Sequence, residues 1–206
     1  MNTWDMIHAE RAGFADTLDG LSDSDWDRQS LSAQWTVRDV VAHMVATATS
    51  TPPKFIAAMA KSGFRFSKMV SNSIQQLENA NSDKELAAMY RAHINSTNGP
   101  PGPAASWLGE TIVHGEDVTR ALGTYGNHNV DYVVAAANFY KKSNMLIGAK
   151  RRISGVQLIA TDADWRHGSG PTVEGPAIAL VLAMTGRRVA LDDLTGEGVE
   201  VLRRSS

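Results

Sequence analysis

The chain has 206 residues, of which 43% are apolar, so it is long enough for one large domain or two small ones with a hydrophobic core. Its 20 basic and 22 acidic side chains are mixed along most of the sequence and give a formal charge of −2, which excludes an overall field that would attract nucleic acid or an anionic membrane. The absence of cysteine excludes disulfides, thiolate metal ligands and a nucleophilic thiol, so any sulfur chemistry has to arrive with a cofactor.

The start of the chain, MNTWDMIHAE, has an acid and a histidine where a secretory signal would have a basic stretch followed by an apolar one. The longest apolar run, residues 176–184, is less than half of the roughly 20 residues that a membrane-spanning helix needs. We therefore expect a cytoplasmic protein without a membrane partner.

Local signals predict three helices in the first half of the chain. Apolar residues at three- and four-residue steps predict a helix over the first twenty residues that ends near Gly20. Thr36 with Asp39 and Ser82 with Glu85 are capping-box pairs, in which each side chain of the pair can accept a hydrogen bond from the other's backbone N–H. Each pair predicts that a helix begins there.

Further helices are predicted between and after these starts. A helical stretch over residues 55–74 is weakened by Gly63. The segment 98–103, NGPPGP, excludes regular structure, and helices are predicted for residues 104–122 and 131–147. These elements predict a helical bundle.

The pattern changes from Gly155 onward. A short strand is predicted for residues 156–160, and an apolar helix follows at 176–184. We therefore predict a helical domain over residues 1–150 and a small α+β domain over residues 151–206. The three bases at this boundary could contact a phosphate, although the dipole of the preceding helix and a solvated linker explain them more simply.

Three side chains form a candidate metal site. Glu110 and His114 are four residues apart on a predicted helix, which places them on one face with Cβ atoms about 6 Å apart, and Asp117 follows on the same face. His43 lies in an apolar run of another helix, where a solvent-facing polar residue is not expected. Three ligands from two helices would leave one metal position open, as in catalytic zinc sites.

Other interpretations of these residues stay open from the sequence. A histidine among apolar residues is often a hydrogen-bonded core residue, which applies to His43. Glu110 could pair with a neighbouring base, and Asp117 could pair with Arg120 three residues further on.

Longer stretches of sequence around these residues resemble a known family. Residues 35–43, WTVRDVVAH, and 109–123, GETIVHGEDVTRALG, resemble the actinobacterial maleylpyruvate isomerase family of mycothiol-dependent enzymes. Residues 173–199, VEGPAIALVLAMTGRRVALDDLTGEGV, are similar to the small C-terminal α+β domain of that family. The resemblance implies a mainly α fold in which a DinB-like four-helix bundle precedes this domain.

The resemblance also implies ligands and roles. It implies that His43, Glu110 and His114 bind a divalent metal, which is zinc in the characterised isomerases, and that mycothiol is the cofactor. It implies catalytic roles for Asp117 and for Arg187.

The segment that contains Arg187 leaves one alternative open. Arg188 is the rival for its role, and the two arginines are the candidates for contact with the cofactor.

We therefore expect a metal-dependent enzyme that uses mycothiol for isomerisation or thiol transfer on a small electrophilic substrate. It would act as a monomer or a homodimer, without a nucleic-acid partner. Two alternatives remain, a non-catalytic module that binds a metal or ligand, and a hydrolase that uses metal-bound water without a thiol.

Overall fold

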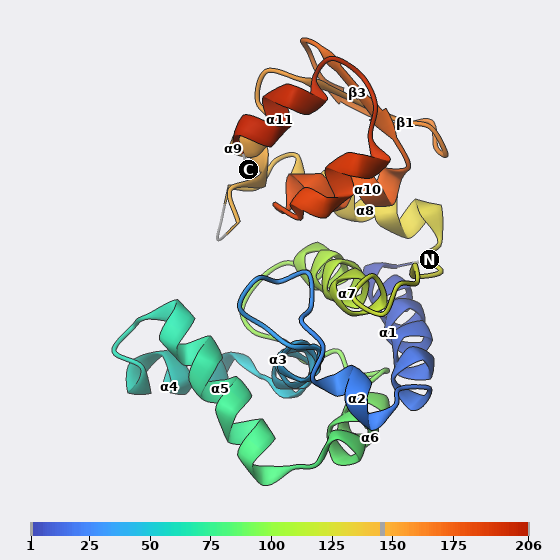
Figure 1. Cartoon of the computed structure of the whole chain (residues 1–206). Coiled ribbons are helices and arrows are strands. Elements are labelled where there is room, and N and C mark those ends of the chain that lie inside the picture. Colours follow the sequence, from blue (N-terminus) through green and yellow to red (C-terminus); the bar gives the residue numbers. More distant parts are fainter. Residues whose placement is uncertain (1, 145–146, 206) are drawn as a thin grey trace. The chain divides into compact units, whose positions relative to one another are not determined.

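The computed structural model describes residues 2–144 and 147–205 (Figure 1). The chain divides into two compact units. The first contains the chain up to Trp107 together with His114–Asn127, and the second contains Leu108–Val113 together with the chain from His128 onward. Helix α7 (Ala104–Thr119) thus contributes residues to both units. The domain boundary that the sequence places after residue 150 stays a prediction.

The first unit is helical. Besides its part of α7 it contains α1 (Thr3–Asp19), α2 (Asp23–Trp26), α3 (Val37–Thr49), α4 (Pro52–Lys61), α5 (Phe66–Ala80) and α6 (Asp83–Ala92). Helix α3 packs against α5 and α6, and α1 packs against α6, so α3 lies among the other helices of this unit (Figure 1). Its buried face supplies much of the core, including Val40, Val41 and Val45.

The capping boxes form as predicted. The Thr36 N–H donates to Asp39 Oδ2 at 2.8 Å, and the Ser82 N–H donates to Glu85 Oε2 at 2.7 Å. The first helix ends at Asp19 with Gly20 as its C-cap, which is also as predicted. These starts and ends depend on neighbouring residues alone, which is why sequence patterns locate them.

The predicted helical stretch over residues 55–74 forms two helices, because the chain turns at Gly63. Gly63 and Phe64 both adopt left-handed backbone conformations, with φ of 64° and 58°. The Phe64 N–H donates to the Met59 carbonyl at 2.8 Å and the Gly63 N–H donates to the Ala60 carbonyl at 3.0 Å, as in a Schellman motif. These bonds end α4 and redirect the chain into α5.

Two predicted helices are shorter than expected. Helix α7 ends at Thr119, three residues before the predicted end at 122. Helix α8 (Val130–Tyr140) ends seven residues before the predicted end at 147, and positions 145–146 lie outside the described residues.

The second unit holds a three-stranded sheet with helices. It contains α8, α9 (Ala149–Arg152), β1 (Gln157–Ala160), β2 (Arg166–Gly168), β3 (Thr172–Gly175), α10 (Ala177–Met184), the 3-10 helix η1 (Arg188–Asp193) and α11 (Val199–Ser205). The strand order is β2-β1-β3; β1 is antiparallel to β2 and parallel to β3, with Leu158 opposite Val173. Helix α10 is apolar all round and packs against α8, which buries it.

The expectation of a mainly α fold with a small C-terminal α+β part is therefore confirmed. The predicted strand at 156–160 corresponds to β1, and the predicted helix at 176–184 corresponds to α10 with Pro176 as its N-cap. Across the described ranges, no helix combines the length and the apolar character that crossing a membrane requires.

Two helix glycines give a matched test of packing. A Cβ atom at Gly109 would lie 2.5 Å from Tyr140 Oη, whereas a Cβ atom at Gly13 would have no atom within 4 Å from the described residues outside its own helical turn. We expect Gly109→Ala to lower the free energy of unfolding by about 1–3 kcal/mol, since the Tyr140 ring would have to move. Gly13→Ala should raise it by up to about 1 kcal/mol, because alanine favours helix. Urea unfolding followed by circular dichroism measures both; equal effects would contradict the packing.

Candidate functional site

The loop before α3 holds Trp35 in a fixed position. Its backbone carbonyl accepts hydrogen bonds from the Ser30 N–H at 3.0 Å, from Ser30 Oγ at 2.6 Å and from Gln29 Nε2 at 2.7 Å. The Leu31 N–H donates to the Asp117 carbonyl of α7 at 3.2 Å, which ties the same loop to that helix. The loop therefore fixes the backbone from which the Trp35 ring extends.

His43 projects from the second turn of α3. Its immediate neighbours Ala42 and Met44 are buried in the core of the first unit, and His43 itself is half-buried. The capping box at Thr36 fixes where this helix begins and therefore which way residue 43 faces.

Three aromatic rings meet in the first unit. The His43 and His114 rings have centroids 5.0 Å apart and lie edge to face, with planes at 76°. The Trp35 ring lies against both, with its centroid 4.8 Å from His43 and 5.6 Å from His114. The fold thus brings together two imidazoles that are far apart in the sequence, next to an indole.

A buried carboxylate orients one of the two imidazoles. His114 Nδ1 lies 2.8 Å from Asp117 Oδ2, and the Asp117 side chain is 0% exposed while that of His114 is 13% exposed. A carboxylate can only accept, so this hydrogen bond requires the proton of His114 on Nδ1 and leaves the lone pair on Nε2. Metal-ligating histidines are typically held by such a carboxylate.

Glu116, the residue before Asp117, has a structural role that differs from that of Asp117. Glu116 is buried and pairs through Oε2 with Arg120 Nε at 2.5 Å, while Oε1 accepts the Gly126 N–H at 2.7 Å. These bonds hold the chain that follows α7 against the helix. Glu116 therefore stabilises the end of α7, and Asp117, one residue later, faces His114.

The predicted metal ligands are placed as follows. His43 and His114 lie side by side in the first unit, whereas Glu110 lies on α7 one turn before His114, in the segment that groups with the second unit. Over residues 2–144 and 147–205, no group of three or more His, Asp and Glu side chains is arranged to hold a metal ion. The two imidazoles and the oriented Nε2 suit zinc chemically, and the three-ligand set stays a prediction.

The predicted arginines lie in the second unit. Arg187 directly precedes η1, which begins at Arg188, and Arg187 Nη1 donates to the Thr185 carbonyl at 3.1 Å. Their roles toward a substrate or cofactor stay predictions.

Sequence analysis did not assign Trp35 to the site. The residue directly precedes the capping box of α3, but large aromatic residues usually belong to the core, so the type of residue alone does not identify it. The signal that could have found it is the polar loop before it, because the hydrogen bonds that position Trp35 come from Gln29 and Ser30.

Fold and site define a class of protein. It is a two-unit chain whose helical N-terminal part holds the His43 and His114 imidazoles side by side, with the buried Asp117 carboxylate hydrogen-bonded to His114. Residues 7–99 match the family model described as the mycothiol maleylpyruvate isomerase N-terminal domain. This match to the N-terminal part of the chain confirms the resemblance inferred from its sequence motifs.

Two solved structures share the fold. One is a crystal structure of a mycothiol-dependent maleylpyruvate isomerase, with a TM-score of 0.62 and 14% identity. The other is a histidine-to-alanine mutant of a mycothiol-dependent maleylpyruvate isomerase, with a TM-score of 0.61 and 13% identity. Each comparison covers 95% of this chain and 91% of the other. A sequence comparison with curated proteins finds no match.

The tautomer of His114 can be tested directly. In metal-free protein at mildly alkaline pH, ¹⁵N–¹H correlation spectra should show the His114 proton on Nδ1, because Asp117 Oδ2 accepts it. Asp117→Ala should remove this preference. His93, whose Nδ1 lies 2.7 Å from the Met89 carbonyl, serves as the internal control and should keep its Nδ1 proton in both proteins. A wild-type His114 with its proton on Nε2 would contradict the assigned hydrogen bond.

Proposed function

We propose that the chain is an enzyme that uses mycothiol as its thiol cofactor and isomerises, or transfers the thiol to, a small electrophilic substrate. The observation that carries the proposal is the pair of imidazoles, one oriented by a buried carboxylate, within a chain whose residues 7–99 match the mycothiol maleylpyruvate isomerase N-terminal domain. The two solved structures described above are of mycothiol-dependent maleylpyruvate isomerase, which supports mycothiol as the cofactor and isomerisation as the reaction.

The proposal includes a divalent metal, zinc by preference, held by His43 and His114 with Glu110 as the third ligand. The support is chemical: two adjacent imidazoles, an Nε2 lone pair on His114, and a carboxylate one helical turn before it. A bound zinc ion with an open position lowers the pKa of a coordinated thiol or water, so that the anion is available near neutral pH.

The roles of the other residues follow from their positions. Asp117 is a positioning residue, because it holds the tautomer and the ring orientation of His114. Trp35 forms an apolar wall beside both imidazoles, which excludes water from that side. Water exclusion strengthens electrostatic interactions with a developing charge at the site.

Arg187 is proposed to bind a carboxylate of the substrate. A guanidinium can donate two parallel hydrogen bonds to a carboxylate, which fixes its orientation as well as its charge. Arg188, the next residue, is the alternative donor, and either could contact the cofactor.

The metal proposal is tested by zinc titration of the purified chain. We expect wild-type protein to bind one zinc ion, His43→Ala to lose binding, and Asp117→Asn to bind about 10–100-fold more weakly because His114 is no longer held by a charged acceptor. His167→Gln, which removes a histidine of β2 in the second unit, is the matched control and should bind as wild type does. A wild-type chain that takes up no zinc at neutral pH would refute the metal site.

The enzyme proposal is tested by a conjugation and isomerisation screen of small unsaturated acids, with and without mycothiol. We expect turnover that requires mycothiol and that falls by about 100-fold or more in His43→Ala, since the loss of a ligand removes transition-state stabilisation. His167→Gln should retain full turnover.

Each other outcome of the screen identifies an alternative. Turnover of esters or amides without a thiol would identify a hydrolase. Zinc binding without turnover in any variant, and without mycothiol binding at millimolar concentration, would identify a non-catalytic module.

A further inference from the structure

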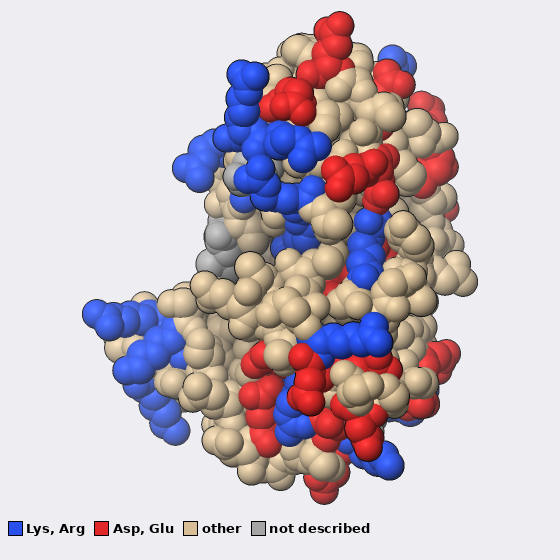
Figure 2. Space-filling model, in the orientation of Figure 1, with Lys and Arg blue, Asp and Glu red and all other residues tan. Residues whose placement is uncertain are grey.

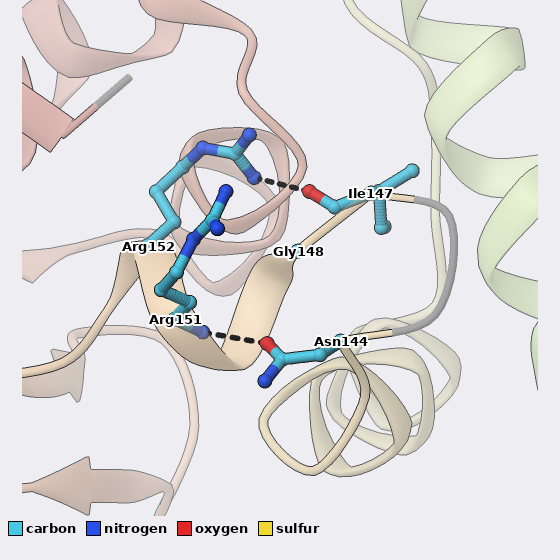
Figure 3. A pocket seen from close by; sticks show the side chains of 5 residues that line it. All are labelled: Asn144, Ile147, Gly148, Arg151 and Arg152. Atoms are coloured by element: carbon cyan, nitrogen blue, oxygen red, sulfur yellow. Dashed lines mark hydrogen bonds between the residues drawn. The ribbon is translucent and has the colours of Figure 1, made fainter.

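A cavity in the second unit lies where the chain passes from α8 into α9. It has a volume of about 400 Å³ and is lined by Asn144, Ile147, Gly148, Arg151 and Arg152 (Figure 3). Ligand pockets for small molecules occupy roughly 300–1,000 Å³, so this cavity is large enough for a small organic molecule. None of its lining residues is used by the proposed function.

Two guanidinium groups extend side by side at this cavity (Figure 3). Arg152 is held from within the unit, because its Nη1 donates to the Ile147 carbonyl at 2.9 Å and to the Met184 carbonyl at 2.7 Å. Its Nε atom is buried and has no hydrogen-bond partner among the described residues. Arg151 lies beside it with an exposed side chain. The Arg152 guanidinium is thus held in place by hydrogen bonds, whereas the exposed Arg151 guanidinium can adjust its position.

The remaining lining residues complete a set of donors. The Arg151 backbone N–H donates to Asn144 Oδ1 at 2.8 Å, so the oxygen of that amide is engaged and its NH₂ group remains as a donor. Ile147 contributes its carbonyl to Arg152 and lines the cavity as an apolar residue. The cavity therefore offers hydrogen-bond donors, positive charge and one apolar residue.

The positive charge of the cavity is not compensated by acids. None of the five lining residues is acidic, and neither Arg151 nor Arg152 forms an ion pair within the described parts of the chain. Burial and the neighbouring charges of Arg151 and Arg187 lower the pKa of Arg152. Lysine and arginine also gather on the surface of the second unit near α9 and α11 (Figure 2). Like charges held together are unfavourable until an anion joins them.

We propose that this cavity binds a small organic anion through its carboxylate or phosphate group. The guanidinium groups of Arg151 and Arg152 and the NH₂ group of Asn144 would donate to the oxygens of the anion, and Ile147 would contact its carbon skeleton. The proposed site requires neither thiol nor metal. It therefore adds a second binding function to the chain.

The experiment is a calorimetric titration of the full-length, metal-free and thiol-free protein at low ionic strength. Inorganic phosphate and succinate are the two probes, and they distinguish a phosphate site from a carboxylate site. We expect saturable binding of at least one probe, weakened about tenfold or more in Arg151→Gln because one charge-assisted donor is lost. Arg151 is exposed, so the variant should fold normally, which its thermal unfolding curve will verify.

The matched control is Arg166→Gln on β2, an exposed arginine outside the cavity that gives the same change in net charge. It should bind both probes as wild type does, since Arg166 does not line the cavity. Absence of saturable binding of either probe would overturn the proposal. So would equal weakening in Arg151→Gln and Arg166→Gln, because binding would then follow net charge rather than this cavity.

Discussion

The candidate site depends on the hydrogen bond between His114 Nδ1 and the Asp117 carboxylate. A carboxylate with no exposure to water is strongly unfavourable unless donors satisfy it, and the His114 imidazole is one such donor. The two residues are one helical turn apart, which makes the bond a property of α7 itself. It determines the tautomer of His114, and hence which nitrogen is left to bind a ligand.

Helix α7 carries two adjacent carboxylates that serve different purposes. Consecutive residues of a helix point about 100° apart, so Glu116 and Asp117 face different surroundings. Glu116 binds Arg120 and the Gly126 N–H and thereby fixes the chain that follows the helix. The Asp117 carbonyl, in turn, accepts the Leu31 N–H of the loop that positions Trp35. Stability of the fold and geometry of the site therefore depend on the same short segment.

The sequence predicted those features that depend on near neighbours. The capping boxes at Thr36 and Ser82 lie where expected, and the helical spacing of Glu110, His114 and Asp117 placed them on one helix. The pairing of His43 with His114 was first proposed because His43 lies in an apolar run of another helix, and the family resemblance strengthened that proposal. The parallel pairing of β1 with β3 was missed, because a register between distant strands is not encoded by local periodicity. The position of Trp35 was not predicted because it depends on a polar loop rather than on an apolar pattern.

The net charge of the chain does not reveal the local positive charge around Arg151 and Arg152 in the second unit. The formal charge of −2 indicates no preference for an anionic partner, and three consecutive bases after a helix are usually explained by its dipole. The preceding helix α8 ends at Tyr140, however, ten residues before Lys150, and the effect of a helix dipole falls off within its last turn. Arg152 is instead held by two carbonyls, from Ile147 and Met184, which belong to different parts of the unit. Packing, rather than the dipole, therefore places a guanidinium beside Arg151, and a local positive field results within a nearly neutral chain.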